Sequence, residues 1–421
     1  MVRKLRVAID CRITDSHQGI GTAVLALAKA LSESSVSSQD YTFIVRETME
    51  SWLTPYVYGP CRLKGIPESR ASSVKGALRR VAPLRFAWRK LLGGMASLPV
   101  SDGYVEAEGF DVVHFPTQEA YLTDLPTIYQ PHDLQHLHYP EFFSKTEVEL
   151  RERRYRAFCE QATAVCVHAE WTKQDIIRWY SLAPGKVRVI KWGMVFDAYQ
   201  SPSAGIRQIT AEKYNLPSQF FFYPAVTWPH KNHEGIIRAL SILKEKHGLT
   251  PDVYCTGSTT PFRKKLDEIA RESGTFQQMH YLGFVSPDEL QTIYGLATAL
   301  VYASKFEGFG LPILEAFHAG LPVVCSNASV LPEIAQDGVL YFDPESPEQL
   351  ASRMKTLLEN QEVRRGLVDK GRLVLSQYSF RDTASAFQTL YAQSALQQPT
   401  KSEEIPRENV ASSIAVGRPA R

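Results

Sequence analysis

Apolar and polar positions follow two different periods along most of this chain. Short apolar runs of four to seven residues recur, and longer segments with apolar residues at spacings of three and four lie between them. The runs are typical of strands buried on both faces, and the longer segments are typical of amphipathic helices. A regular succession of strand and helix predicts an α/β fold with parallel sheets.

The pattern predicts twelve strands and at least eleven helices. The strands are expected at residues 5–9, 41–45, 111–115, 127–130, 164–167, 187–190, 220–223, 252–256, 280–283, 297–303, 322–326 and 338–342. The helices are expected at 23–31, 147–161, 172–179, 234–246, 262–272, 287–296, 312–319, from 330 onward, and at 347–359, 362–378 and 380–391.

The length of 421 residues predicts two domains rather than one. A polar stretch at 197–218, with Pro202 and Gly205, is interpreted as the linker between them. The predicted domains are therefore residues 1–198 and 199–379. From 397 to 421 the chain is polar without a lasting period, which predicts a disordered tail.

Composition and charge argue against several classes of function. A net charge of +2 gives no overall attraction to a polyanion, so we expect no nucleic-acid partner. The six cysteines form no C-x-x-C pair, which disfavours a metal cluster or a disulfide framework and favours buried thiols in a reducing cytosol. No window approaches the roughly 20 apolar residues that cross a bilayer, and no signal peptide is recognised, so a cytoplasmic, at most peripheral, protein is expected.

One segment, residues 61–95, combines basic charge with a helical apolar stripe. Nine Lys and Arg residues are met there by Glu68 alone, and Pro83 interrupts the stripe. Two interpretations stay open. Residues 62–92 can lie on an anionic membrane surface, or the stripe can pack on a sheet while the basic face is solvated.

The most specific pattern spans residues 304–322, which read SKFEGFGLPILEAFHAGLP. A predicted strand precedes it, residues 308–310 read Gly-Phe-Gly, and Pro312 suits the first turn of a helix. This order leaves backbone N–H groups at a positive helix end, which suits a diphosphate. Glu307 and Glu315 lie eight positions apart, and the second can accept hydrogen bonds from a ribose diol. The alternative is a generic strand–turn–helix with two surface glutamates.

Three further motifs can carry chemistry. Gly19-Ile20-Gly21 precedes a predicted helix, but the third glycine of G-x-G-x-x-G is missing, which argues against NAD. His132-Asp133 follows a strand and is either a catalytic pair or a turn histidine beside a helix cap. Lys231 opens a helix, where a lysine can lie against a phosphate or simply face solvent.

Glu307, Gly308–Leu311 and Glu315 together resemble the E-x7-E signature of the family 4 glycosyltransferases, and the resemblance covers residues 5–395. It implies the GT-B architecture, with two Rossmann-like domains facing a cleft, the N-terminal one on the acceptor side and the C-terminal one binding the nucleotide sugar. It also implies that residues 380–396 form a helix that returns to the N-terminal domain.

The implied reaction is transfer of a hexose, with retained configuration, from a nucleotide diphosphate sugar to a hydroxyl of a sugar or lipid-linked acceptor. The implied setting is the synthesis of a cell-surface polysaccharide or glycolipid. The His-Lys-Asn-His context at 230–233 favours a guanosine-linked mannose donor.

The resemblance also implies roles for single residues. Glu307 and His132 would contact the donor sugar and Lys231 the diphosphate, and these three are the predicted catalytic residues. Glu315 would bind the nucleotide ribose. The other predicted donor-binding residues are Gly19, Gly21, Val285, Gly308, Phe309, Gly310 and Leu311.

The chain departs from the family pattern in two places. Residues 225–227 lack an arginine that is often found there, which puts the strength of diphosphate binding in doubt. Val167-His168 stands where Val-Ser is common, and its meaning stays open. No Asp-x-Asp motif stands near the phosphate site, so we expect no required metal and no cofactor besides the nucleotide sugar.

No residue in the chain is recognised as a covalent nucleophile, so we favour front-face attack in which the leaving diphosphate takes the acceptor proton. Other functions remain as alternatives. A GT-B epimerase or phosphorylase would share the fold, although the pyridoxal-binding lysine of a phosphorylase is not found. A non-catalytic GT-B homologue would bind a nucleotide sugar or act as a scaffold. An NAD-dependent dehydrogenase is the least favoured.

Overall fold

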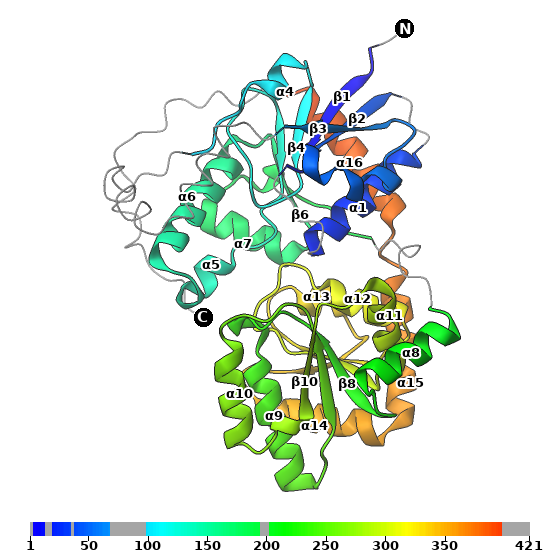
Figure 1. Ribbon diagram of the computed structural model, residues 1–421. Coiled ribbons are helices and arrows are strands. Elements are labelled where there is room, and N and C mark those ends of the chain that lie inside the picture. The colour runs from blue at the N-terminus through cyan, green and yellow to red at the C-terminus, as the bar shows by residue number, and fades with distance from the viewer. Residues whose placement is uncertain (1–2, 13–18, 35–37, 68–97, 194–201, 398–421) are drawn as a thin grey trace.

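The computed structural model describes residues 3–12, 19–34, 38–67, 98–193 and 202–397. Its strands form two sheets, and Figure 1 shows them one above the other, each surrounded by helices. The first sheet has the strand order β3-β2-β1-β4-β5-β6-β7, and the second has the order β10-β9-β8-β11-β12-β13. All their paired strands run parallel, which confirms the predicted α/β fold with parallel sheets.

The strands of the first sheet are β1 Leu5–Asp10, β2 Gln39–Arg46, β3 Cys61–Ile66, β4 Val112–Phe115, β5 Thr127–Tyr129, β6 Ala164–Val167 and β7 Val187–Val189. The second sheet has β8 Phe220–Pro224, β9 Asp252–Thr256, β10 Met279–Gly283, β11 Ala299–Tyr302, β12 Val323–Ser326 and β13 Leu340–Phe342. We call each sheet with its helices the N-terminal and the C-terminal lobe.

The helices of the N-terminal lobe include α1 Gly19–Ser32, α4 Tyr104–Ala107, α5 Gln135–His138, α6 Lys145–Gln161 and α7 Glu170–Tyr180. The later helices are α8 Ala204–Tyr214, α9 His233–His247, α10 Arg263–Glu272, α11 Pro287–Leu296, α12 Leu311–His318, α13 Leu331–Ala335, α14 Pro347–Glu359, α15 Gln361–Leu375 and α16 Phe380–Ala395. None of these described helices has both the length and the apolar character needed to cross a bilayer.

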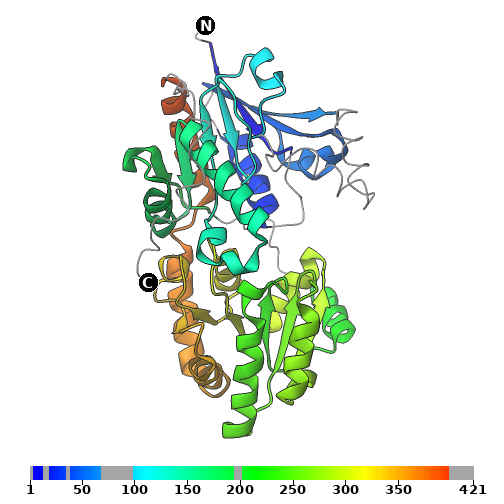
Figure 2. The same cartoon turned by 90° about the vertical axis from the view of Figure 1, so that its left-hand side faces the viewer.

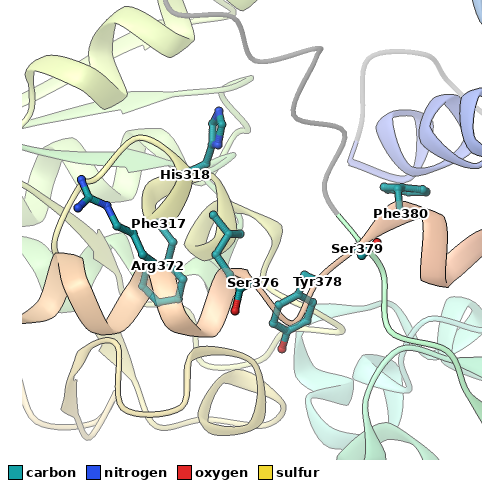
Figure 3. Close-up of a pocket in the computed structure, with 8 residues that line it drawn as sticks. Phe317, His318, Arg372, Ser376, Tyr378, Ser379 and Phe380 are labelled. Atoms are coloured by element: carbon teal, nitrogen blue, oxygen red, sulfur yellow. The ribbon is translucent and has the colours of Figure 1, made fainter.

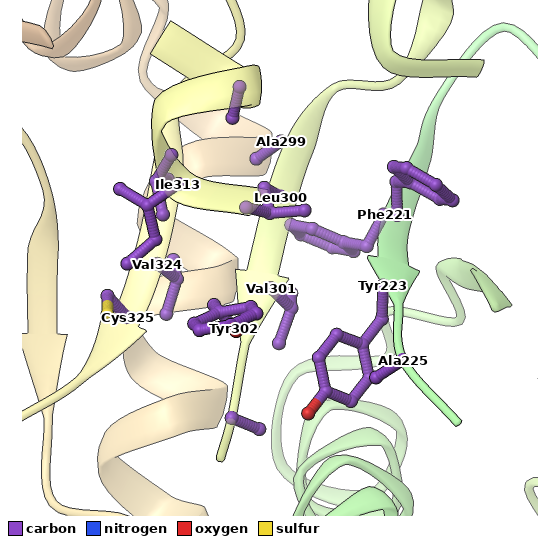
Figure 4. Close-up of a cluster of buried hydrophobic side chains, with 14 of the residues drawn as sticks. Phe221, Tyr223, Ala225, Ala299, Leu300, Val301, Tyr302, Ile313, Val324 and Cys325 are labelled. Carbon is purple, nitrogen blue, oxygen red and sulfur yellow. The ribbon is translucent and has the colours of Figure 1, made fainter. Parts of the chain in front are cut away.

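Each sheet is apolar on both faces because helices cover both. In the N-terminal lobe, one face packs against α1 and α16 and the other against α6 and α7. The C-terminal lobe has one continuous core, in which β8, β11 and β12 contribute Phe221, Leu300 and Val324 (Figure 4). Figure 2 shows α14 and α15 continuing into α16, which reaches the N-terminal lobe. Helix α16 there contacts α1, β1, β4 and β5.

Two sequence predictions about local structure were wrong. The predicted linker at 197–218 contains helix α8, whose first turn is capped by Ser203 and whose end is marked by Asn215 with a positive φ. Only Thr210 of this helix is buried, so its apolar periodicity is weak and its polar composition suggested a loop. Gly19 and Gly21 lie in the first turn of α1, whereas a loop was predicted there.

The basic segment 61–95 begins with a strand rather than a helix. Residues Cys61–Ile66 form β3, an edge strand parallel to β2, and the basic side chains at its surface suit an edge position. Residues 68–95 of the predicted amphipathic stretch lie outside the described residues, as do the predicted domain boundary between 198 and 199 and residues 398–421 of the predicted tail.

Candidate active site

Both sheets reverse their strand order at a central pair of neighbours, β1 with β4 and β8 with β11. The carboxyl ends of the strands at such a point form the common ligand site of open parallel sheets. In the C-terminal lobe, the chain after β8 reaches Lys231 in a 3-10 turn, and the chain after β11 reaches Glu307. Lys231 Nζ lies 2.6 Å from Glu307 Oε1. The structure thus brings two of the three predicted catalytic residues together at the switch point.

The surroundings of Glu307 keep its carboxylate ionised and fixed. Burial raises the pKa of this carboxyl, but the charges of Lys231 and His230 and nearby hydrogen bonds bring it below its usual value. Ser329 Oγ accepts a hydrogen bond from the Glu307 N–H at 3.0 Å and donates one to the Glu307 carbonyl at 3.1 Å. The Lys231 carbonyl accepts a hydrogen bond from the Tyr223 hydroxyl at 2.5 Å. Both partners of the ion pair are therefore anchored through their backbones.

The Gly-Phe-Gly turn follows Glu307 and is sterically confined. Gly310 has a φ of +103°, and a Cβ there would lie 2.9 Å from Leu331 Cδ2. It is the N-cap residue of α12, and no described side chain caps this helix end. Pro312 has no N–H, and the Ile313 N–H donates to the Gly310 carbonyl at 3.0 Å. An anion at this helix end would therefore meet the N–H groups of the glycine turn and of Leu311, and the anion site stays a prediction. Leu311 is the first residue of this helix.

Glu315 lies farther along the same helix and is 9% exposed. Its Oε2 accepts a hydrogen bond from the Tyr294 hydroxyl of α11 at 2.6 Å. The helix and its neighbour therefore orient this carboxylate. Glu315 thus lies within α12, whereas Glu307 lies in the turn that precedes this helix.

His132 faces this turn from the N-terminal lobe. The Asp133 N–H donates to the Pro131 carbonyl at 2.8 Å, which closes a three-residue turn with His132 at a φ of +65°. Such a turn is strained, and strain of this kind concentrates at functional sites. His132 Nε2 donates to the Pro116 carbonyl at 3.0 Å, which leaves the Nδ1 lone pair available. Burial lowers the pKa of His132 to about 4, so its ring is neutral near pH 7.

Gly308 lies directly against the His132–Asp133 turn. A Cβ at Gly308 would lie 3.0 Å from the His132 carbonyl oxygen and 3.2 Å from Asp133 Oδ2. Burial, and to a smaller degree the charge of Glu307, raises the pKa of the Asp133 carboxyl. The absence of a side chain at position 308 therefore permits the two lobes to meet at the candidate site.

The unexplained His168 packs behind this meeting point. Its Nδ1 donates to the Ile190 carbonyl at 2.9 Å, and its ring stacks on Trp192 at 3.8 Å between centroids. The ring of Phe309 lies with its edge toward both, 6.0 Å from each centroid. His168 is thus part of an aromatic stack that supports the glycine turn through Phe309 and the His132 ring, whose centroid is 5.6 Å away.

The remaining predicted site residues, Gly19, Gly21 and Val285, lie outside the segment between β11 and α12. Gly21 is buried in the first turn of α1, and residues 13–18, which precede this helix, lie outside the described residues. Val285 is buried between β10 and Ser286, the N-cap of α11. No described contact joins either residue to the Lys231–Glu307 pair.

Sequence reasoning missed two supporting residues, Ser329 and Tyr294. They lie 22 and 21 positions from the glutamates that they contact. Ser329 and Tyr294 are brought to these glutamates by packing in the C-terminal lobe, so the spacing of residues in the sequence did not predict their contacts. His230, by contrast, is adjacent to Lys231 in sequence, so its place beside the site could be recognised from the sequence alone.

A cavity of about 460 Å³ lies elsewhere, where α15 meets α16 (Figure 3). His318, Arg372, Ser376, Tyr378 and Ser379 are among its lining residues, and none of the predicted site residues lines it. Among the described residues, no three His, Cys, Asp or Glu side chains come together as metal ligands.

Comparison with known proteins assigns the family. Residues 18–195 match the family model described as Glycosyltransferase Family 4, and residues 207–374 match the model described as Glycosyl transferases group 1. This chain belongs to the family 4 glycosyltransferases. The matched residues include the switch point of the second sheet and all three predicted catalytic residues. Strand β1 precedes residue 18 and lies outside the match.

Two curated relatives of this family 4 glycosyltransferase are named as O-antigen chain mannosyltransferases. It is 27% identical over 256 residues to O-antigen chain mannosyltransferase B of Escherichia coli, covering 60% of this chain and 66% of the relative. It is 26% identical over 230 residues to O-antigen chain mannosyltransferase RfbU of Salmonella typhimurium, covering 54% and 59%. Each match spans less than two thirds of the relative's length.

Solved structures confirm the GT-B fold of this family 4 glycosyltransferase. The Anabaena protein HepE, in complex with UDP and glucose, aligns with a TM-score of 0.69 at 16% identity over 92% of this chain and 100% of its own. Sucrose-phosphate synthase from Thermosynechococcus elongatus aligns with a TM-score of 0.68 at 19% identity, covering 93% of this chain and 99% of its own. Likeness at these identities concerns the fold alone.

Proposed function

We propose that this protein transfers mannose from a nucleotide diphosphate sugar to a hydroxyl of a sugar or lipid-linked acceptor during synthesis of a cell-surface polysaccharide. The observation that carries the proposal is the Lys231–Glu307 ion pair beside the uncapped glycine turn, at the switch point of the second sheet. The choice of mannose is supported by the O-antigen mannosyltransferases among the relatives.

The proposed mechanism places the stabilising charges around the leaving diphosphate. Lys231 and the backbone N–H groups of the glycine turn and of Leu311 oppose the negative charge that develops as the bond between the sugar and the diphosphate breaks. The acceptor oxygen bonds to the same face of the sugar, and its proton passes to a diphosphate oxygen, so the anomeric configuration is retained. The neutral His132 accepts a hydrogen bond from a sugar hydroxyl through Nδ1, and Glu315 binds the ribose.

The proposed reaction needs no metal, because a lysine and backbone donors supply the positive potential and no Asp-x-Asp motif stands nearby. Two lobes that close over the donor would limit its hydrolysis by excluding water. We also propose that the acceptor binds to the N-terminal lobe and the nucleotide to the C-terminal lobe.

The decisive experiment offers GDP-mannose, UDP-glucose and UDP-galactose with a mannose-terminated acceptor, in EDTA and then in magnesium. Proton NMR of the product reports both the sugar and its anomeric configuration. We expect an α-mannosyl product from GDP-mannose with equal rates in both buffers. An inverted product or a strict need for magnesium would contradict the mechanism, and nucleotide binding without any turnover would favour the scaffold alternative.

A further inference from the structure

A helix of the N-terminal lobe receives its cap from the C-terminal lobe. Helix α7 begins after Ala169, whose side chain makes no capping hydrogen bond. The two carboxylate oxygens of Glu333, in α13, accept hydrogen bonds from the N–H groups of Glu170 at 2.7 Å and Trp171 at 2.9 Å. A carboxylate is favourable at this helix end, because it satisfies free donors and meets the positive end of the helix dipole.

A second contact between the lobes lies close by. Phe306, which directly precedes Glu307, is only 4% exposed although it follows the end of β11. Its ring packs among three N-terminal-lobe rings, with centroids 5.0 Å from His138, 6.0 Å from Tyr139 and 5.7 Å from Trp171. The Tyr139 hydroxyl also donates to the Lys305 carbonyl at 3.2 Å.

The surface of the N-terminal lobe that contacts Glu333 and Phe306 is itself held in place by hydrogen bonds. Both carboxylate oxygens of Asp175, in α7, lie 2.9 Å from His138 Nε2. Trp171 belongs to the same first turn of α7 that Glu333 caps. Helix α7 therefore presents the aromatic pocket and the capped end as one rigid surface.

The side chains of Phe306 and Glu333 are both linked to Glu307 through the backbone of the C-terminal lobe. Ser329 forms two hydrogen bonds with the Glu307 backbone, and the chain continues from Ser329 through the buried Val330 into α13, which carries Glu333. Phe306 is the neighbour of Glu307 in sequence. Movement of this part of the C-terminal lobe against α7 would therefore move Glu307 and Gly308 against the His132–Asp133 turn.

We propose that Glu333 and Phe306 are positioning residues for the transfer reaction. They dock the C-terminal lobe on α7, and this contact sets the distance between Glu307 and His132 that the reaction needs. The inference rests on the proposed function, because it assumes that donor and acceptor meet between these two residues. The nucleotide, by contrast, would be held by the C-terminal lobe alone and would bind whether or not the contact forms.

The test compares Glu333→Gln and Phe306→Ala with the wild type and with Glu359→Gln, a surface variant at the end of α14. We expect the Kd for GDP, measured by calorimetry, to stay within about threefold in all four proteins. We expect kcat for transfer to fall at least tenfold in the two docking variants, with a larger share of donor hydrolysed by water. The double variant should lose less than the product of the single effects, because both side chains serve one contact.

Conservative variants separate positioning from stability. Glu333→Asp and Phe306→Leu should recover part of kcat, and they replace any stronger variant that fails to fold. Unchanged kcat in soluble, folded docking variants of an active enzyme would overturn the inference while leaving the proposed function intact.

If the wild type turns over none of the donors, the proposed function fails and small-angle scattering with GDP still decides the docking role. An increased radius of gyration in Glu333→Gln would support docking, and an equal radius would overturn it.

Discussion

At the scale of single residues, Lys231 and Glu307 depend on each other. Removing the ammonium would leave a largely buried carboxylate without its cation and would remove the charge that opposes the developing diphosphate. We expect Lys231→Met to lower kcat/KM for the donor by ~10²–10³-fold, the usual effect of losing one stabilising donor. Steady-state kinetics would measure this loss. The matched control is Lys355→Met, whose partner is an exposed glutamate one turn along α14.

Buried histidines make stability depend on pH. Burial lowers the pKa values of His114, His132 and His233 to about 3, 4 and 3. An unfolded histidine titrates near ~6.5, so below that pH the unfolded state binds more protons and folding becomes less favourable. We expect the melting temperature to be roughly 5 °C or more lower at pH 5.0 than at pH 7.5. The stability that depends on these neutral histidines is lost completely only when the pH falls through their pKa values in the folded protein.

Scanning calorimetry across this pH range would test the expectation. His114→Phe removes one of the buried titrating groups and should flatten the decline, whereas the exposed His247→Gln should not. A melting temperature that stays constant between pH 7.5 and 5.0 would show that these histidines do not remain neutral in the folded protein.

At the scale of elements, the two glycines of the turn have different tasks. Gly310 needs its positive φ and the space next to Leu331, so Gly310→Ala should distort the start of α12. Gly308 has no positive φ, and the three atoms nearest to its added Cβ would all belong to the His132–Asp133 turn of the other lobe. We therefore expect Gly310→Ala to weaken nucleotide binding, and Gly308→Ala to preserve it while lowering transfer by at least tenfold.

Calorimetry with GDP and transfer assays on the two variants would separate these tasks. Equal losses of nucleotide affinity would contradict the assignment of Gly308 to the contact between lobes. A Gly308→Ala protein that transfers at the wild-type rate would contradict it as well.

The sequence predicted elements well where the period was strong. The strands at Ala164–Val167 and Asp252–Thr256 have the predicted bounds, because each is built around a short apolar run flanked by polar residues. Helix α8 was missed because it buries only Thr210. The Glu307 turn was recognisable because its chemistry is contiguous. Its support by Ser329 was not, since parallel strands bring together residues that are far apart in sequence.

At the scale of the whole molecule, the fold class was predictable and the meeting of the lobes was not. Alternating strands and helices are a property of each segment, so they could be read without the structure. The capping of α7 by Glu333 depends on how the two lobes approach each other, and no period in the sequence encodes that approach.

The chain leaves the N-terminal lobe after Gly193 and returns to it before α16, and the backbone at Gly193 packs against the backbone at Ser379 and Phe380. A Cβ at Gly193 would lie 2.1 Å from the Phe380 backbone nitrogen and 2.2 Å from the Ser379 carbonyl carbon. Thr383 Oγ1 accepts a hydrogen bond from the Gly193 N–H at 2.9 Å and donates to the Lys191 carbonyl at 2.8 Å. The backbone at Gly193 is therefore held against the start of α16.

Because of this contact, adding one methyl group at Gly193 should strongly lower the stability of the protein. Gly193→Ala cannot be accommodated without backbone movement, so the two backbone segments must separate and the hydrogen bonds through Thr383 must break. We expect a loss of stability of ~2–4 kcal/mol, in the range of overpacked sites, and a broader distribution of lobe arrangements. Chemical denaturation and small-angle scattering would measure the two effects. Gly185→Ala is the matched control, because nothing lies within 4 Å of its added Cβ. Equal stability of the two variants would mean that these segments move independently and that the lobes are not joined at this point.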